Sequence, residues 1–329
     1  MEKKLTISDI AKLAGVAKST VSRYLNGGSV GKETSRKIQR VIEQNNYQPN
    51  VFARLNARES RIIGLIVPGF KSFTTPKLTE IIVAYLKEKG YTPLIMHTNN
   101  NISEELQSIE RLTAMNVAGI LFEATEVTTI HREAMNNAGV PIVVMGQRFE
   151  DGVSVINDDY HAGYALGQHV GQRGVQRVVC LWVGTFDHAV GQERRRGVLD
   201  ALAACHVPDV RVEETTFLFD DALAAAERLL NTAPLPDAIL CATDRIAGAV
   251  YKAMRAKGLR IPDDISVTGF GDYETSELLT PPMTTVRFDL KTRGESSAET
   301  LLQMIQDKPV SRLQVNGYQL MPRGSVRQP

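Results

Sequence analysis

From residue 62 onward, short runs of β-branched and other apolar residues are interspersed with longer stretches of helical periodicity. The strand-like runs are IIGLIV (62–67), PLIM (93–96), GILF (119–122), IVVM (142–145), VVCLWV (178–183), AILC (238–241), SVTGF (266–270) and TTVRF (284–288). The helical stretches are 76–89, 103–115, 128–138, 159–173, 191–204, 220–231 and 244–257. This pattern predicts an α/β fold in which parallel sheets carry helices on both faces, in two successive lobes.

The first 45 residues have a different pattern, which predicts three short helices over 7–14, 18–26 and 32–45. The apolar residues expected to face a shared small core are Ile10, Leu13, Ala14, Val21, Leu25, Ile38, Val41 and Ile42. The Thr6 hydroxyl can cap the first helix at the Asp9 amide. Gly15-Val16-Ala17 supplies a tight turn, so the first two helices form a helix-turn-helix.

Charge is divided unevenly along the chain. The whole chain carries 38 Lys/Arg and 37 Asp/Glu, a formal net charge of +1. Residues 1–61 hold twelve of the basic and five of the acidic residues, a net +7, which leaves −6 on residues 62–329. A basic end on an acidic body is typical of a nucleic-acid-binding protein, although charge alone also fits a solvated surface.

No sequence feature supports an enzyme, a cofactor or a metal site. There is no phosphate-binding loop, and Gly64 and Gly69 do not form a GxGxxG motif. Cys180, Cys205 and Cys241 have no CxxC spacing, and we expect them to be reduced core residues. No run approaches the roughly 18 apolar residues of a membrane helix, and the first residues do not resemble a signal peptide. We therefore expect a cytoplasmic protein with no membrane partner.

Two segments carry a specific resemblance. TISDIAKLAGVAKSTVSRYLNGG (6–28) and NYQPNVFARL (46–55) resemble, in order and spacing, the DNA-binding module of the lactose-repressor/galactose-repressor family. The resemblance implies a three-helix module over 1–48 whose second helix enters the major groove of double-stranded operator DNA. The implied DNA-binding residues are Lys18, Ser19 and Arg23 as base readers, Thr20 and Ser22 as phosphate contacts, and Thr6, Asn26, Asn50 and Leu55. An arginine near the start of such a helix can donate two hydrogen bonds to guanine; plain solvent exposure is the alternative for Lys18 and Ser19.

The chain departs from the family pattern in the linker, which we place at 49–61. The resemblance implies a short hinge helix capped by Asn50, with Leu55 as a wedge into the minor groove. This chain has one residue fewer than usual before that Leu, and deleting one residue from a helix rotates the residues after it by about 100°. We therefore expect an altered hinge register. Ala17 and Gly31 also stand where the family commonly has capping Ser, which predicts a modestly weakened module.

For residues 62–329 the resemblance implies a two-lobed periplasmic-binding-protein-like core that binds effector and dimerises. Its first lobe would comprise about 62–158 and 290–317, and its second about 159–287 and 318–329, with crossings near 157–161, 286–291 and 316–319. Ligand would lie between the lobes, at the carboxyl ends of the strands. Because no leucine-heptad tail follows, we predict a homodimer rather than a tetramer.

The candidate effector-binding residues combine hydrogen-bonding groups with an aromatic face, which suits a sugar ring. They are Thr74, Thr75 and Gln147 in the first lobe, and His188, Arg194, Phe217, Thr243, Asp244 and Asp272 in the second. The family motif Arg-x-x-Gly places the ligand arginine at Arg194.

Each of these candidates has a structural alternative. Arg194 can be a surface arginine, Phe217 a core residue, Asp244 a helix cap and His188 a structural histidine. Thr243 and Gly271 depart from the residues that the family often has there.

The sequence therefore predicts a transcriptional repressor of a carbohydrate-utilisation operon, controlled by a sugar or sugar phosphate. Regulators of the sucrose or trehalose type are the nearest expectation. A co-repressor-dependent regulator and a sugar-binding transport protein are the alternatives, and the basic N-terminal module argues against the second.

Overall fold

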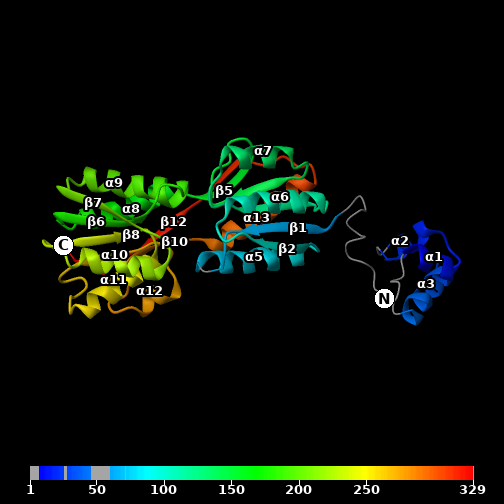
Figure 1. Cartoon of the computed structure of the whole chain (residues 1–329), viewed down its shortest axis with the longest axis horizontal. Coiled ribbons are helices and arrows are strands. Elements are labelled where there is room, and N and C mark those ends of the chain that lie inside the picture. Colours follow the sequence, from blue (N-terminus) through cyan, green and yellow to red (C-terminus); the bar gives the residue numbers. More distant parts are fainter. Residues whose placement is uncertain (1–6, 26–27, 46–59, 71, 329) are drawn as a thin grey trace. The chain divides into compact units, whose positions relative to one another are not determined.

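The structure, a computed structural model, describes residues 7–25, 28–45, 60–70 and 72–328. The chain divides into two compact units, which we call the N-terminal unit (Met1–Ser60) and the core unit (Arg61–Pro329). Figure 1 labels many of the elements of both.

The N-terminal unit contains α1 (Ile7–Ala14), α2 (Lys18–Leu25) and α3 (Lys32–Gln44), within one residue of the predicted helices. Its small core consists of the buried residues Ile10, Ala11, Val21 and Ile38, with Ala14, Val16, Tyr24, Leu25, Val41 and Ile42 packed around them. Gly15 has φ +65°, a left-handed conformation that suits glycine in the turn between α1 and α2.

One core residue of the N-terminal unit was predicted wrongly. Leu13 is 56% exposed, whereas Ala11 is buried. Successive helical residues are rotated by about 100°, so Ile10, Ala11 and Ala14 fall on one face and Leu13 lies beyond its edge. The predicted Thr6 cap lies outside the described residues.

The first lobe of the core unit is built on a six-stranded sheet of order β11-β5-β4-β3-β1-β2, in which every pairing is parallel. The strands are β1 (Ile62–Val67), β2 (Thr92–His97), β3 (Gly119–Glu123), β4 (Ile142–Met145), β5 (Val153–Asn157) and β11 (Leu313–Asn316). Helices α5 (Thr74–Glu88) and α13 (Leu290–Ile305) share one apolar cluster with the sheet. Helices α6 (Ile102–Ala114) and α7 (Thr129–Asn137) share the other, so both faces are covered.

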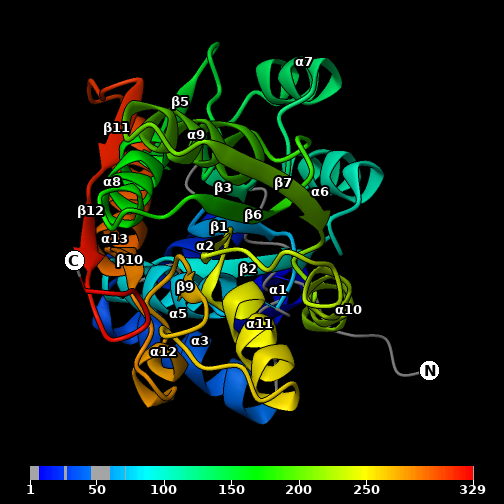
Figure 2. The ribbon, with the colours of Figure 1, turned by 90° about the vertical axis from the view of Figure 1, so that its left-hand side faces the viewer.

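The second lobe has a parallel four-stranded sheet of order β7-β6-β8-β9. Its elements are α8 (Asp159–Gly171), β6 (Arg177–Val183), β7 (Asp209–Thr215), α10 (Phe219–Leu229), β8 (Ala238–Cys241), α11 (Asp244–Ala256), β9 (Ser266–Thr268) and α12 (Glu274–Leu278). The stretch predicted as a helix over 191–204 starts earlier, as a π-helix over His188–Arg194 that continues into α9 (Arg195–Ala204). Figures 1 and 2 show α8 and α9 on one side of this sheet, and α10 and α11 on the other.

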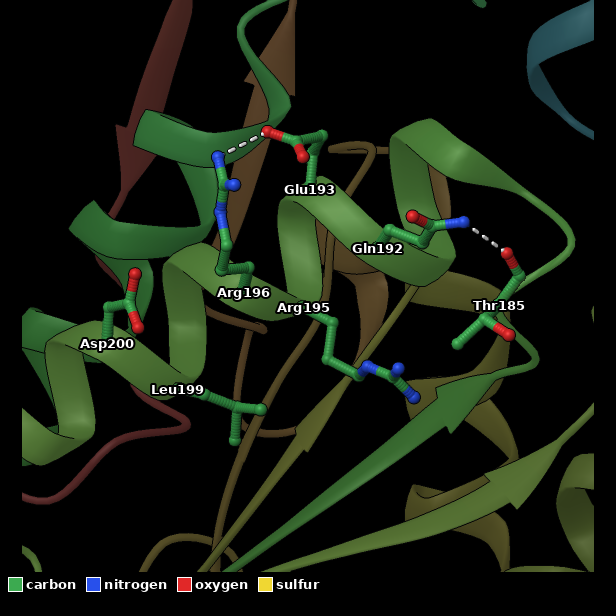
Figure 3. Close-up of a pocket in the computed structure, with 7 residues that line it drawn as sticks. All are labelled: Thr185, Gln192, Glu193, Arg195, Arg196, Leu199 and Asp200. Atoms are coloured by element: carbon green, nitrogen blue, oxygen red, sulfur yellow. Dashed lines mark hydrogen bonds and ion pairs between the residues drawn. The ribbon is translucent and has the colours of Figure 1, made fainter.

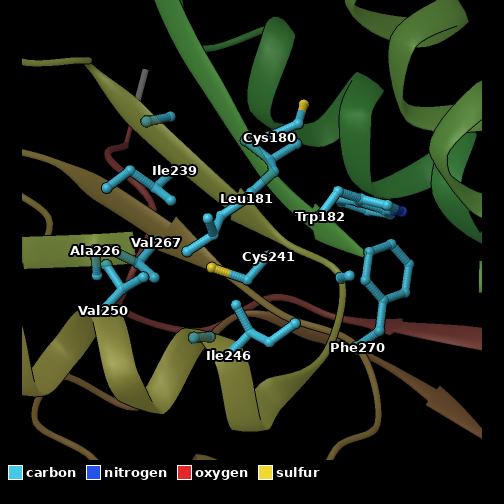
Figure 4. Close-up of a cluster of buried hydrophobic side chains, with 14 of the residues drawn as sticks. Cys180, Leu181, Trp182, Ala226, Ile239, Cys241, Ile246, Val250, Val267 and Phe270 are labelled. Atoms are coloured by element: carbon cyan, nitrogen blue, oxygen red, sulfur yellow. The ribbon is translucent and has the colours of Figure 1, made fainter. Parts of the chain in front are cut away.

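The second lobe encloses a large apolar core (Figure 4). Trp182 and Phe270 meet edge to face, with ring centroids 5.9 Å apart. Cys180 and Cys241 are buried in this core and free, as expected, whereas Cys205 is free but only half-buried. Burial raises the pKa of the Cys180 thiol to about 12, so the thiol stays protonated at neutral pH.

The chain passes between the two sheets three times. It leaves the first sheet after β5 and enters α8. It then returns through β10 (Thr285–Phe288) into α13, and finally leaves β11 for β12 (Tyr318–Met321). β10 and β12 pair antiparallel at the crossings, with Phe288 opposite Tyr318. The Asp158 amide donates to the Asn316 carbonyl over 2.9 Å, which joins the first crossing to the third.

Helices α8 and α9 approach each other so closely that glycine is required between them. A Cβ atom at Gly197 would lie 2.0 Å from the Tyr160 carbonyl oxygen, and one at Gly163 would lie 2.2 Å from the Arg194 carbonyl oxygen. Both obstacles are backbone atoms, which cannot rotate away. The interface between the two helices therefore has no room for a larger side chain at either position.

This packing predicts opposite effects for two Gly→Ala substitutions. Gly197→Ala should destabilise the protein by about 1–3 kcal/mol or more, because the new methyl group overlaps the α8 backbone. Gly248→Ala in α11 meets no atom within 4 Å and should be neutral or stabilise by roughly 0.4–1 kcal/mol. Urea unfolding of both variants measures the difference. Equal midpoints would contradict the close α8–α9 packing.

Candidate functional site

The polar side chains of α2 face solvent, whereas its apolar residues hold the helix in place. Val21 is fully buried, and the predicted base readers Lys18, Ser19 and Arg23 are exposed. The predicted phosphate contacts Thr20 and Ser22 are half-buried. This helix therefore presents a basic, hydrogen-bonding surface on a rigid base. Thr6, Asn26, Asn50 and Leu55, with the predicted hinge helix, lie outside the described residues.

In the core unit, several candidate effector residues stand where strands end and helices begin. Thr74 and Thr75 open α5, Gln147 follows β4, and Thr243 and Asp244 follow β8. These are the carboxyl ends of parallel strands, the usual binding edge of an open α/β sheet. The edge of the first-lobe sheet and the edge of the second-lobe sheet at which these residues lie face each other. We call the region where they meet the interlobe interface.

Two sets of contacts bridge the interlobe interface. Gln147 is buried, and its Nε2 donates to Asp187 Oδ1 in the second lobe over 3.1 Å and to the Thr125 carbonyl over 3.2 Å. On the other side, the Thr74 hydroxyl lies 3.4 Å from the Tyr273 hydroxyl. The Phe73 and Tyr273 rings stack with centroids 4.7 Å apart. These contacts place Thr74 and Gln147 directly at the meeting of the lobes.

Arg194 is buried, with 6% of its surface exposed, rather than on the surface. Its Nε and Nη2 donate to Asp159 Oδ1 over 2.8 and 2.6 Å, and its Nη1 donates to the Ala242 carbonyl over 2.8 Å. The guanidinium lies 4.7 Å from the Phe270 ring centroid and 5.1 Å from that of Phe288. Arg194 therefore joins the first crossing, the end of β8 and the β10 crossing.

Two hydrogen bonds at Val190 hold the first turn of the π-helix that carries Arg194. The Asp187 carboxylate caps it by accepting from the Val190 amide over 2.9 Å. The Trp182 indole donates to the Val190 carbonyl over 2.7 Å. Burial raises the pKa of Asp187, while the Val190 amide, Gln147 and Arg194 oppose that shift.

Asp244 is buried, and its carboxylate serves the packing of the second lobe. Its Oδ2 accepts from the Tyr273 amide and the Ser276 hydroxyl over 3.0 and 2.6 Å, and its Oδ1 accepts from the Thr285 hydroxyl over 2.5 Å. Burial raises its pKa, although these three hydrogen bonds favour the ionised form. The cap of α11 is Thr243, whose hydroxyl accepts from the Ile246 amide over 3.3 Å.

The other three candidates have distinct surroundings. Asp272 forms ion pairs with Arg287 Nε and Arg323 Nη2, both at 2.6 Å. Phe217 is half-buried and packs against the second-lobe core. His188 is exposed at the start of the π-helix. Asp272 and His188 are the chain neighbours of Tyr273 and Asp187, which contact Thr74 and Gln147.

Sequence reasoning missed several polar residues at the interlobe interface. Asp159, Asp187 and Tyr273 form the contacts given above. Glu123, at the end of β3, and Arg293, near the start of α13, form a buried pair with 3.5 Å between Oε1 and Nη2. Glu123 could have been found from its position as a charged residue ending an apolar strand.

A cavity of about 530 Å³ lies elsewhere on the second lobe (Figure 3). Its lining residues are Thr185, Gln192, Glu193, Arg195, Arg196, Leu199 and Asp200. None of the predicted effector residues lines it. Within the described residues, no group of three or more His, Cys, Asp or Glu side chains is placed to hold a metal ion, and no helix is long and apolar enough to cross a membrane.

Comparison with known proteins places both units. Residues 6–50 match the family of bacterial regulatory proteins, lacI family, and residues 168–326 match a periplasmic binding protein-like domain. The fold is similar to that of the lac repressor dimer bound to operator and an anti-inducer, with a TM-score of 0.86 and 23% identity over 98% of this chain and 99% of that one. It is also similar to the transcriptional regulator CelR in complex with cellobiose, with a TM-score of 0.74 and 27% identity over the same shares.

These matches bear out the predicted fold class, a helix-turn-helix module with a two-lobed α/β core. The sucrose operon repressor of Staphylococcus xylosus is 35% identical over 308 residues, which cover 93% of this chain and 95% of that protein. On this similarity along nearly all of both chains, the protein belongs to the lacI family of bacterial regulatory proteins.

Proposed function

We propose that this protein is a homodimeric transcriptional repressor of a carbohydrate-utilisation operon, and that a sugar bound at the interlobe interface controls its affinity for operator DNA. The observation that carries the proposal is the setting of Arg194. A single guanidinium, at the position of the family's ligand arginine, is anchored on Asp159 where the chain crosses between lobes. A ligand that engages Arg194 therefore acts directly on the crossing.

The proposed division of labour follows the two units. Residues 1–48 read DNA through α2, residues 49–61 form the hinge, and residues 62–329 bind the effector and dimerise. Two copies present two α2 helices to two half-sites of a palindromic operator. Since the operator is in the cytoplasm, we place the protein there. The relatives support this reading, because one is named a sucrose operon repressor and another was solved with cellobiose.

Effector control is a difference in affinity between two states of the core. The sugar binds the state that does not bind DNA more tightly than the state that does. The ratio of these two affinities is the largest factor by which the sugar can weaken operator binding. By linkage, operator DNA weakens sugar binding by the same factor. In a co-repressor-dependent regulator of the same fold, the effector tightens operator binding. The direction of the change in operator affinity therefore distinguishes the two functions.

The experiment that tests this function is a fluorescence-anisotropy titration of the full chain on its own upstream DNA. It is run with no sugar and with a panel of mono- and disaccharides that includes sucrose and cellobiose. Salt-dependent specific binding that one sugar releases supports an inducible repressor. Binding that one sugar tightens replaces it by the co-repressor function, and the absence of specific binding contradicts the repressor proposal.

Arg23→Ala should weaken operator binding by about 1–3 kcal/mol, roughly 5- to 150-fold, because it removes a base contact of α2. The matched control is Arg211→Ala, which removes the same charge from an exposed side chain of β7 that pairs with Asp209. The control should bind operator like the natural chain. Equal losses in both variants would indicate that charge, and not base reading, is responsible.

Gln147→Leu should weaken sugar binding about tenfold, because it leaves the half-buried Asp187 carboxylate without one of its hydrogen bonds and removes a polar group from the proposed site. The control is Gln107→Leu, on the exposed surface of α6. Isothermal titration calorimetry with the sugar that releases operator DNA measures both. Unchanged sugar affinity in Gln147→Leu would remove Gln147 from the effector site.

A further inference from the structure

The wall of the interlobe interface in the first lobe contains two charged side chains whose hydrogen bonding is incomplete. Glu123 is 8% exposed and Arg293 is 4% exposed. Their direct contact is the 3.5 Å approach of Nη2 to Oε1. Glu123 Oε2 and Arg293 Nε are buried without a hydrogen-bond partner among the described residues. Buried polar atoms in folded proteins are nearly always hydrogen-bonded, so both atoms call for an explanation.

The pair stands at the binding edge of the first sheet. Glu123 is the last residue of β3, and Gly146 directly follows the last residue of the neighbouring β4. A Cβ atom at Gly146, where φ is +81°, would lie 3.2 Å from Arg293 Nη2. The next residue is Gln147, which bridges to the second lobe. The pair is therefore continuous with the proposed effector site.

The two buried arginines of the interlobe interface are each paired with a carboxylate. Arg293 contacts Glu123 in the first lobe, and Arg194 contacts Asp159 in the second. The half-buried Asp187 and the buried Asp244 carboxylates add negative charge, and their hydrogen-bond donors are amide and hydroxyl groups. A phosphate dianion placed here would meet carboxylates and arginines that are already neutralised.

A hydroxyl group has the complementary chemistry. It can donate to Glu123 Oε2 and at the same time accept from Arg293 Nε, and neighbouring hydroxyls of a sugar ring can divide the two tasks. A hydroxyl that hydrogen-bonds to these buried atoms removes the free-energy cost of leaving them without partners. That cost is largest for charged groups.

We infer that Glu123 and Arg293 form a hydroxyl-binding pair that makes the effector of this repressor a neutral, hydroxyl-rich sugar and excludes its phosphorylated form. The inference rests on the proposed function, because it concerns the effector of that same site. It selects one of the two effector classes that the sequence left open. Glu123 acts as the selective element, since its carboxylate accepts from a hydroxyl and repels a phosphate.

The test compares sucrose with sucrose 6-phosphate, and glucose with glucose 6-phosphate, by calorimetry on the full chain. For the sugar that binds, the neutral form should bind at least about 100-fold more tightly than its phosphate. Glu123→Gln, which keeps the size of the side chain and removes its charge, should weaken the neutral sugar roughly tenfold and reduce the preference over the phosphate by a similar factor.

Gln147→Leu is the matched control. Gln147 is buried, carries no charge and directly follows Gly146, which lies against Arg293. Removing an uncharged group should weaken both forms of the sugar alike and leave their ratio unchanged. Thermal unfolding of each variant verifies that the chain is folded. A merely structural role for Glu123 would lower stability without changing the ratio.

The outcomes separate this inference from the proposed function. Tighter binding of the phosphorylated form, or an unchanged ratio in folded Glu123→Gln, overturns the hydroxyl-binding pair and leaves the repressor function intact. If neither form of any sugar binds while specific operator binding persists, the sugar effector itself is wrong, and this inference falls with it.

Discussion

The buried ion pair between Arg194 and Asp159 is the interaction on which the rest of the core depends. Asp159 is the first residue of α8, where the chain enters the second lobe, and it accepts two hydrogen bonds from Arg194. Removing one partner of a buried pair costs about 3–5 kcal/mol, because the other charge remains buried without compensation. The same guanidinium binds the Ala242 carbonyl and lies against Phe288 at the second crossing. One side chain thus fixes two of the three crossings relative to the second sheet.

This arrangement gives a physical route from ligand to lobe geometry. The close glycine contacts leave α8 and α9 little room to shift past each other, and Arg194 is bonded directly to Asp159 at the first crossing. The first lobe contributes its own polar wall, with Gln147 bridging to Asp187 and the Glu123–Arg293 pair beside it. A ligand that contacts both walls shifts the equilibrium between two lobe arrangements. The shift is no larger than the difference between its binding free energies for the two arrangements.

Much of the fold could be predicted from the sequence, because it depends on local pattern. The three short helices of the N-terminal unit and the apolar strands β1, β3, β6 and β8 follow from periodicity and β-branched runs. β7 was missed because it is an edge strand whose residues are mostly polar and exposed. Leu13 was wrongly assigned to the core. It is close in sequence to the buried residues of α1, but a rotation of about 100° per residue places it beyond the edge of their face. The π-helix that ends at Arg194 has no distinct sequence signal.

The candidate site was predicted less completely, for a different reason. The family motif pointed to Arg194, and Gln147 was expected to line the first lobe, but their partners, which lie 35 and 40 residues away, were not predicted. Glu123 and Arg293 are 170 residues apart and meet only because the chain returns to the first lobe. Asp272 lies among arginines that no local pattern reveals. The roles of these residues toward a ligand stay predictions.

The most direct measurement of the central claim is the sugar affinity of the protein with and without saturating operator DNA. Linkage requires that operator weaken sugar binding by the same factor by which sugar weakens operator binding. We predict equal factors greater than about fivefold, typical of allosteric coupling. A sugar affinity that operator DNA leaves unchanged would contradict the account, because the interlobe interface would then not be coupled to DNA.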